Sequence, residues 1–431
     1  MLQTLRSAWK TPDLRKKLLF TLLMLFIFRL GSYVPVPGLS EAAVSEFLGG
    51  FGGGMQGLLN NFSGGALERA SIFAMGISPY INSSIIMQLL TVAIPALERM
   101  SKEGEEGKKK IASITRYVTV ILGFIQAVGL YFGMASALEG GNNPMNFIVI
   151  TLTLTAGTAF LMWLGEQITE KGVGNGISML IFAGIVSQAG AMIQSLRAML
   201  FSSGTIEFSS IMTLIAILAI SVISIAFVVL MNDAERRIPV QYAKRVVGRK
   251  MYGGQSTHIP LKISMAGVIP IIFAISIMSF PQTINMFING QAMPESPFWA
   301  AILSVFQQTH PVYIVLYFLL ILFFTYFYTA IQFNPIEIAN NMKKNGGFVP
   351  GIRPGKPTSD YIARILSKIT LFGAFFLAIV AIFPILLAFV PNLAGVSLGG
   401  TSLLIVVGVA LETVKQIESQ LLTRQYKGFL E

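Results

Sequence analysis

The chain has 431 residues, of which 54% are hydrophobic and only 12% are charged, and its formal net charge is +11. Soluble proteins carry about 25% charged residues, so this composition excludes an ordinary soluble enzyme and indicates a membrane protein. The sequence contains no cysteine, which excludes disulfides, thiolate nucleophiles and metal sites built on cysteine.

Ten apolar stretches follow one another along the chain, each close to the roughly 20 residues that cross a bilayer as a helix. Because lipid offers no hydrogen-bond partner to free backbone groups, we predict that all ten are helical. The first stretch follows basic residues, as in a signal sequence, but lacks a small-residue cleavage site, so we interpret it as a retained span. The expected spans are residues 18–37, 75–96, 115–137, 148–168, 177–198, 210–231, 263–285, 311–331, 365–388 and 400–419.

The segments between these stretches alternate between basic and almost uncharged. Every second segment is basic, and together these hold 26 of the 31 lysines and arginines. An excess of Lys and Arg marks the cytoplasmic side of a membrane protein, so we expect both termini to be cytoplasmic. Arg69 and Arg197 are the basic residues of the opposite segments. The basic segments are residues 1–17, 97–117, 166–176, 232–262, 332–364 and 421–431.

Five of the expected spans precede residue 205 and five follow it. With an odd number of spans in each half, the second half enters the membrane in the opposite sense from the first. That arrangement is typical of inverted repeats, in which a transport pathway lies between the halves. We therefore predict an all-α membrane protein of two five-helix halves, residues 1–205 and 206–431.

Residues 49–74 break the plain pattern of spans. They begin with a glycine-rich run, become moderately apolar, and carry Glu68 and Arg69. The segment is too short and too polar to cross the membrane. A re-entrant helix on a glycine hinge requires protein or a water-filled cavity around it, whereas an external loop requires neither. The residues alone favour the external loop.

Two basic segments, 232–262 and 332–364, are longer than a connection between adjacent spans requires. The first alternates apolar and polar residues from Arg236 onward, which predicts a hairpin projecting into the cytosol. The second is punctuated by glycine and proline between Gly346 and Gly355, which predicts a shaped turn. Long basic loops either bind an acidic partner, such as RNA or a charged protein, or only fix the orientation of the chain.

The sequence contains no recognisable catalytic constellation, so we expect neither an enzyme nor a bound cofactor or metal. His258 and His310 belong to no metal-binding motif. The glycine-rich residues 172–176 follow no expected strand, so they predict a tight turn and not a phosphate loop.

Ionisable residues within the expected spans are sparse, which disfavours an ion-coupled carrier. Arg29 is the one least easily explained by a position near the end of a span. The residues alone leave a passive pore, a carrier and a structural scaffold open. The four candidates are Arg29, Lys368, Glu412 and Lys415.

Several motifs resemble the SecY family, the central subunits of the bacterial protein-conducting channel. They occur in the family's order and cover essentially the whole chain. They are GISPYI within residues 69–90, WLGEQITE at 163–170, GNGIS at 174–178, QSTHIPLK at 255–262, the loop at 348–355 and GTSLLIVV at 400–407.

This resemblance implies an hourglass pore between the two halves, closed at its waist by a ring of aliphatic side chains. Two pairs of these residues are spaced i, i+4, so each pair lies on one face of its helix. In the seventh span Ile271 is an adjacent alternative to Ile272. The implied ring is Ile81, Ile85, Ile181, Ile185, Ile272 and Ile405.

The resemblance also implies a short re-entrant helix at about residues 58–72 that plugs the pore from outside. It changes our preferred interpretation of this segment from external loop to plug. The expected plug residues are Leu58, Leu59, Phe62, Leu67, Glu68, Arg69 and Ile72.

A lateral gate between the second and seventh spans is a further implication of the resemblance. Apolar segments of a passing chain would leave through it into the lipid. The expected gate residues are Asn82, Ser83, Ser84, Gln88 and Thr91 on one side, and Ser276, Ser279 and Gln282 on the other.

The two long basic loops become docking sites under the same resemblance. The implied partners are the ribosome with its nascent chain, the motor ATPase SecA, the small membrane subunits SecE and SecG, translocating precursor proteins and membrane lipids. The implied location is the bacterial plasma (inner) membrane. The expected docking residues are Arg353, followed by Lys244, Arg245, Arg249 and Lys250.

Overall fold

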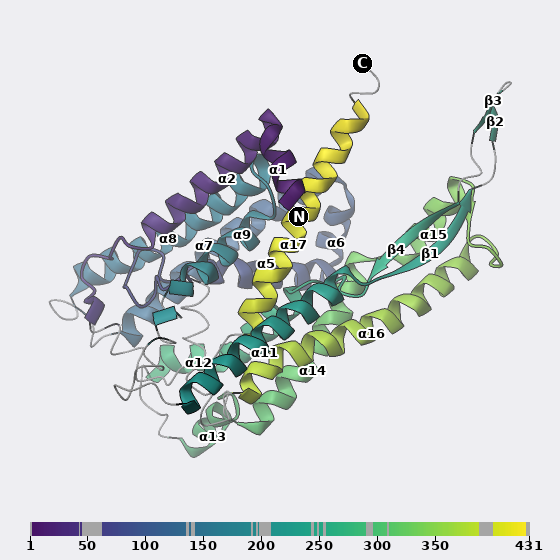
Figure 1. Cartoon of the computed structure of the whole chain (residues 1–431). Coiled ribbons are helices and arrows are strands. Elements are labelled where there is room, and N and C mark those ends of the chain that lie inside the picture. Colours follow the sequence, from purple (N-terminus) through teal and green to yellow (C-terminus); the bar gives the residue numbers. More distant parts are fainter. Residues whose placement is uncertain are drawn as a thin grey trace. The chain divides into compact units, whose positions relative to one another are not determined.

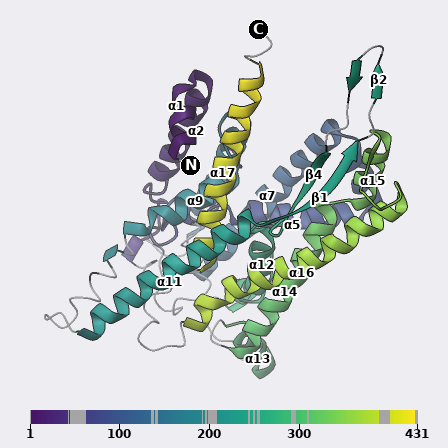
Figure 2. The same ribbon diagram turned by 45° about the vertical axis from the view of Figure 1, so that its right-hand side comes forward.

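The computed structural model describes most of the chain, and Figures 1 and 2 show its elements in two views related by a 45° turn. Every structural statement below refers to the described residues. These are residues 2–42, 44, 63–134, 138, 143–190, 193–194, 197, 208–242, 245–247, 250–252, 256–289, 296–307, 310–387 and 400–427.

Each of the ten expected spans overlaps a helix of its own, and the second also reaches the first two residues of the shorter helix α6 (Pro95–Lys102), which confirms the all-α prediction. Within the described residues, four shorter helices accompany them: α1 (Leu2–Lys10), α6, α13 (Pro297–Val305) and α15 (Pro335–Lys344). The ten helices in the expected spans are α2 (Pro12–Gly31), α5 (Ser78–Ala93), α7 (Glu105–Gly133), α8 (Pro144–Lys171), α9 (Gly176–Ser187), α11 (Phe208–Asp233), α12 (Ile269–Asn289), α14 (Pro311–Gln332), α16 (Lys356–Leu387) and α17 (Gly400–Lys427).

The ten helices differ in how well they are suited to cross a membrane alone. Five described helices, α7, α8, α11, α14 and α16, are long and apolar enough to span it by length and composition. Helices α5 and α6 form a sixth candidate as a pair, bent by 100° at the break before Pro95. Helix α9 and residues 269–282 of α12 are shorter apolar helices, and α2 and α17 carry several charged residues.

Local sequence signals explain where several helices begin. Proline lies in the first turn of α2, α5, α6, α8, α13 and α15, where its fixed φ is favourable and its missing N–H is not needed. Asn175 caps α9 by accepting hydrogen bonds from the backbone N–H groups of Ile177 and Ser178 at 3.1 and 3.3 Å. Asn334 caps α15 in the same way.

The chain divides into two compact units, which we describe separately. The first unit comprises residues 1–215, 276–313 and 405–431, and the second comprises 216–275 and 314–404. The division into two halves near residue 205 stays a prediction.

In the first unit, the two ends of the chain meet. Thr4 Oγ1 on α1 donates a 2.9 Å hydrogen bond to Glu418 Oε1 on α17. The backbone N–H of Gly174 donates a 2.7 Å bond to Gln416 Oε1. Around these bonds, a small buried cluster joins Ala8, Leu14, Val173 and Ile417.

The second unit contains the hairpin that the sequence predicts. Strand β1 (Glu235–Tyr242) pairs antiparallel with β4 (Ser256–Lys262), with Ile238 opposite Ile259. Strand β5 (Gly347–Phe348) pairs with the other edge of β1, and two short strands, β2 (Arg245–Val247) and β3 (Lys250–Tyr252), pair with each other.

Both figures show β1 and β4 running beside α15, and an apolar cluster joins them. The alternation in the hairpin sequence is visible in its burial, because Ile238 and Val240 are buried while the residues between and before them are exposed. The predicted hairpin is confirmed, and its projection into the cytosol stays a prediction. The buried cluster is Ile238, Val240, Leu261, Met342, Val349 and Ile362.

Candidate functional site

In the described part of the expected plug, Ser63 is helical, whereas residues 64–72 differ from the expected helix. Residues 64–72 form successive turns around a single bridging position at Ser71. Gly64, Gly65 and Ala70 have φ of 69°, 79° and 47°, in the left-handed region that a right-handed helix excludes. This corrects the helical prediction for these residues. Leu58, Leu59 and Phe62 lie outside the described residues.

We call residues 63–76 the plug segment. Its backbone is joined to the chain that follows α2: the N–H of Val36 donates to the carbonyl of Ala70 at 2.8 Å, and the N–H of Ile72 donates to the carbonyl of Val34 at 3.0 Å. Leu67 is buried and Ile72 packs against the same apolar cluster. Glu68 is exposed and Arg69 is half-buried.

Glycines on the surrounding helices allow the plug segment to approach closely. A Cβ atom on Gly157 of α8 would clash with the carbonyl oxygen of Ile72, and one on Gly31 of α2 would clash with the ring of Phe73. The ring of Phe73 stacks with Phe28 and Phe160 at centroid distances of 6.2 and 5.9 Å. The plug segment is therefore seated against α2 and α8 by shape as well as by hydrogen bonds.

Arg29, the least easily explained charge of the sequence, contacts this segment. Its Nη1 donates hydrogen bonds to the carbonyl of Gly64 at 2.9 Å and to Ser187 Oγ on α9 at 3.0 Å. Sequence reasoning missed this role, because the partners lie 35 and 158 residues away along the chain.

The expected ring residues lie on four helices. In the first unit, Ile85 on α5, Ile181 on α9 and Ile405 on α17 are buried, whereas Ile81 and Ile185 are half-buried.

Ile272 lies in the second unit, near the start of α12, and is half-buried. Its neighbour Ile271 is fully buried.

Most of the expected gate residues described on α5 form hydrogen bonds within the helix, and Ser83 bonds to a neighbouring helix. Gln88 Nε2 lies 3.5 Å from Ser84 Oγ, and Thr91 donates to the carbonyl of Met87 at 2.7 Å. Ser83 is buried and donates a 2.8 Å bond to the carbonyl of Thr115 on α7. The hydroxyl of Ser83 therefore faces α7, and its place at the gate stays a prediction.

On α12, two of the expected gate residues donate hydrogen bonds to backbone carbonyls, one within the helix and one beyond it. Ser279 donates to the carbonyl of Ser276 at 2.6 Å, and Gln282 Nε2 donates to the carbonyl of Phe306 at 2.8 Å. Pairing across the seam between α5 and α12 stays a prediction, as does the placement of Asn82 on it.

The docking residue expected first, Arg353, is exposed in a turn of the second unit. The carbonyl of Arg353 accepts a 2.8 Å bond from Thr358 Oγ1, and Gly351 and Gly355 have φ of 82° and 104°. The predicted shaped turn is confirmed. Ile352 packs against the apolar cluster of the hairpin, so the side chain before Arg353 anchors the turn while the side chain of Arg353 is exposed.

Of the other docking residues, Arg245 and Lys250 belong to the paired strands β2 and β3. Lys244 and Arg249 lie outside the described residues.

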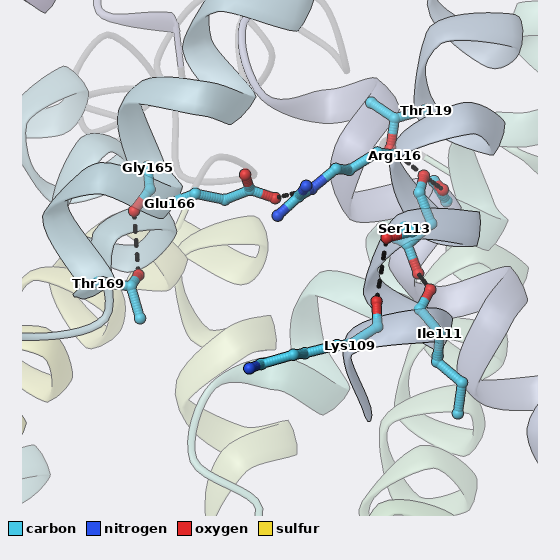
Figure 3. Close-up of polar contacts among 10 residues, drawn as sticks. Lys109, Ile111, Ser113, Arg116, Thr119, Gly165, Glu166 and Thr169 are labelled. Carbon is cyan, nitrogen blue, oxygen red and sulfur yellow. Dashed lines mark hydrogen bonds and ion pairs between the residues drawn. The ribbon is translucent and has the colours of Figure 1, made fainter. Parts of the chain in front are cut away.

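A polar junction between α7 and α8 was missed by sequence reasoning (Figure 3). Arg116 Nε donates a 2.7 Å bond to Glu166 Oε1, and both side chains are partly exposed. One turn further along α8, Thr169 Oγ1 donates to the carbonyl of Gly165 and accepts from the N–H of Gly176 at 2.9 Å. The available signal was a pair of opposite charges in two segments expected on the same side of the membrane.

The glycine-rich residues 172–176 form the predicted tight turn between α8 and α9, with Gly174 at a φ of 87°. Among the described residues no group of three or more histidines, aspartates and glutamates is placed to hold a metal ion.

Comparison with known sequences gives a consistent result. The SecY family model matches residues 71–414. The protein translocase subunit SecY of Halalkalibacterium halodurans is 49% identical over 440 residues, and that of Bacillus subtilis is 45% identical over 444 residues. Both matches cover the whole of this chain and of the relative.

Comparison with solved structures shows the shared fold. The structure of a protein conducting channel has a TM-score of 0.64 at 18% identity, covering 94% of this chain and 92% of that one. A structure concerning the plug domain of the SecY protein has a TM-score of 0.62 at 19% identity, with the same coverage. Canine Sec61 in a ribosome–channel complex has a TM-score of 0.60 at 17% identity, again covering 94% and 92%.

Proposed function

Since this chain belongs to the SecY family and is a subunit of a protein translocation channel, we propose that unfolded, signal-bearing polypeptides cross the membrane through a pore closed by its isoleucine ring. The observation that carries the proposal is the full-length match to translocase subunits. It is supported by the isoleucine pairs of α5 and α9 and by a buried plug segment seated between helices of the first unit.

An aliphatic ring suits this task for a physical reason. A translocating chain presents every kind of side chain, so the narrowest point cannot depend on specific polar contacts. A narrow apolar collar can dewet and block ions when idle, yet it makes no strong contact with a passing chain. In the seventh span we keep the ring position at Ile272, which the family motif implies and which is half-buried, with the buried Ile271 as the adjacent alternative.

Apolar segments leave the pore sideways, between α5 and α12. Asn82, Ser84, Gln88 and Thr91 of α5 retain exposed surface in this chain. Hydrogen bonds between membrane helices average only about 0.6 kcal/mol each. A seam closed by such bonds opens readily when an apolar signal segment offers burial in lipid.

The partners dock on the second unit. The exposed Arg353 turn and the hairpin that carries β2 and β3 form its basic loops, and basic surfaces attract acidic protein or RNA. We assign these surfaces to the motor ATPase SecA and to the ribosome with its nascent chain, and we expect SecE and SecG as membrane partners. The chain itself hydrolyses nothing, so the energy comes from the motor, from translation or from the membrane potential.

The chain is a multi-pass protein of the bacterial membrane. The alternation of basic and uncharged segments supports cytoplasmic placement of both termini and of the docking loops.

Reconstitution tests the proposal. The chain is placed in vesicles with SecE, SecG, SecA and ATP, and a signal-bearing precursor is added. We expect the precursor to become protected from external protease, with vesicles that contain a Bacillus subtilis SecY complex as the positive control. Absence of protection where the control transports would overturn the proposal, and saturable uptake of a small solute that depends on Glu412 would indicate a carrier instead.

A further inference from the structure

Two arginine side chains converge on one backbone carbonyl of the plug segment. Arg29 Nη1 donates to the carbonyl of Gly64 at 2.9 Å, and Arg69 Nη1 donates to the same oxygen at 3.3 Å. Arg29 also donates from Nη1 to Ser187 Oγ at 3.0 Å and from Nη2 to the hydroxyl of Tyr33 at 2.7 Å. One guanidinium on α2 thus reaches the plug segment, α9 and its own chain just beyond the helix end.

The two cations also share one aromatic ring. The Cζ atoms of Arg29 and Arg69 lie 4.7 and 4.6 Å from the ring centroid of Tyr33, within the range of cation–π attraction. Two like charges this close repel each other. The shared carbonyl and the shared ring offset that repulsion. Because Gly64 and Arg69 both belong to the plug segment, the two arginines stay this close only while that segment is in place.

Gly64 is required for the contact. A Cβ atom there would lie 2.9 Å from Ser187 Oγ and 3.1 Å from the Cα of Gly184. Gly64 also has a φ of 69°, which disfavours any other residue. The glycine therefore brings its bare carbonyl to the Arg29 side chain against α9.

The other end of the plug segment is fixed differently. Ala70 and Ile72 are joined to Val36 and Val34 by backbone hydrogen bonds. That pairing provides a fixed base at residues 70–72, and the left-handed Gly64 and Gly65 form turns at the opposite end of the segment. Movement about this base carries Arg69 away from Arg29, which relieves their repulsion and offsets part of the cost of breaking the Gly64 contact.

We propose that Arg29 is a positioning residue that latches the plug segment closed by holding the Gly64 carbonyl against Ser187, and that Arg69 sets how easily the latch releases. This inference rests on the proposed role of residues 63–76 as the plug. An arginine within a membrane span is costly, and its planar fork serves three acceptors at once, which a lysine ammonium serves less well.

The test uses the absence of native cysteine. Ser63→Cys places a single thiol at a buried position of the plug segment, and a membrane-impermeant maleimide reports its exposure in the reconstituted complex with SecE and SecG. Ion leakage from the same idle vesicles is measured in parallel. The variants are Arg29→Gln and Arg29→Lys, and Lys368→Gln is the control because Lys368 is an exposed charge in another expected span.

We expect Arg29→Gln to raise both the labelling rate and the ion leak about tenfold. The reason is that losing a hydrogen bond from a charged donor shifts the equilibrium away from the closed state by about that factor. Arg29→Lys gives a smaller rise, and Lys368→Gln leaves both rates unchanged. Labelling and leakage at the parental rates in Arg29→Gln would overturn the latch.

Two milder variants keep the proposal testable if Arg29→Gln fails to accumulate in the membrane. Ser187→Ala and Tyr33→Phe each remove one hydroxyl that Arg29 contacts, without changing the charge. Each is expected to raise labelling about threefold, and unchanged labelling in both would contradict the latch.

Precursor transport by the parental complex separates this inference from the proposed function. If the parental complex transports and Arg29→Gln shows no added leak, only the latch fails. If the parental complex transports nothing, the proposed function fails whatever the labelling shows.

Discussion

Arg116 on α7 and Glu166 on α8 form a 2.7 Å ion pair, with side-chain exposures of 47% and 24%. The two residues lie 50 positions apart in the sequence and point toward one another between the helices (Figure 3). Ion pairs this exposed are worth about 0–1 kcal/mol, so the pair fixes the register of α7 against α8 more than it stabilises the unit.

This weak but specific pairing gives the first prediction. Arg116→Gln is expected to lower the free energy of unfolding by less than about 1 kcal/mol. The double variant Arg116→Glu with Glu166→Arg restores a pair of opposite charges. We therefore expect its free energy of unfolding to regain most of that loss. Thermal unfolding of the two single variants and the double variant in detergent measures the coupling, and additive losses in the double variant would show that the contact has no energetic role.

Close packing of the plug segment on α8 gives the second prediction. Gly157→Ala places a methyl group where the Ile72 carbonyl now lies, and because that neighbour is backbone, the segment must shift. We expect a loss of about 1–3 kcal/mol, as in other overpacked sites, together with faster labelling of Ser63→Cys. Gly190→Ala is the matched control, since nothing lies within 4 Å of its Cβ position. Equal melting temperatures in the two variants would contradict this account of the packing.

The third prediction concerns the seam between α5 and α12. Cysteines replacing Ser84 and Ser279 are expected to crosslink on oxidation and to stop precursor transport, which reduction then restores. The pair Ser113→Cys with Ser279→Cys is the control, because Ser113 lies on α7 and bonds to its own helix. Gel mobility reports the crosslink and protease protection reports transport. A crosslinked Ser84–Ser279 pair that transports at the normal rate would rule out the lateral exit.

The fourth prediction concerns docking. Arg353→Glu is expected to weaken SecA binding to vesicles about tenfold at low salt and by less at high salt, because exposed charges are screened over about 10 Å at 0.1 M. Arg6→Glu makes the same charge change at an exposed residue of α1 and is expected to have little effect. Equal affinities for both variants would remove Arg353 from the docking surface.

The sequence predicted those features that depend on local pattern. Apolar stretches gave the ten helices, and alternation around Ile238 gave the β1–β4 hairpin. The turn at Gly174 followed from its glycines. In each of these cases the residues that determine the structure are neighbours in the chain, so their pattern is readable without the fold.

The features that the sequence did not predict depend on distant contacts. Nothing local to Ala70 shows that it adopts a φ of 47° or that its carbonyl and the N–H of Ile72 pair with residues 34–36. The family resemblance placed Ser83 on the gate side of α5, and nothing in the local sequence shows that its hydroxyl donates to a carbonyl of α7. The partners of Arg29 likewise become visible only when α2, α9 and the plug segment are brought together.

The contact between α1 and α17 has a consequence for biogenesis. Ala8, Leu14 and Val173 are shielded by Ile417, which the ribosome adds some 400 residues after Ala8. During synthesis, the apolar face formed by Ala8, Leu14 and Val173 therefore stays uncovered until α17 is made. A nascent chain that stalls before α17 is made would leave this apolar face exposed.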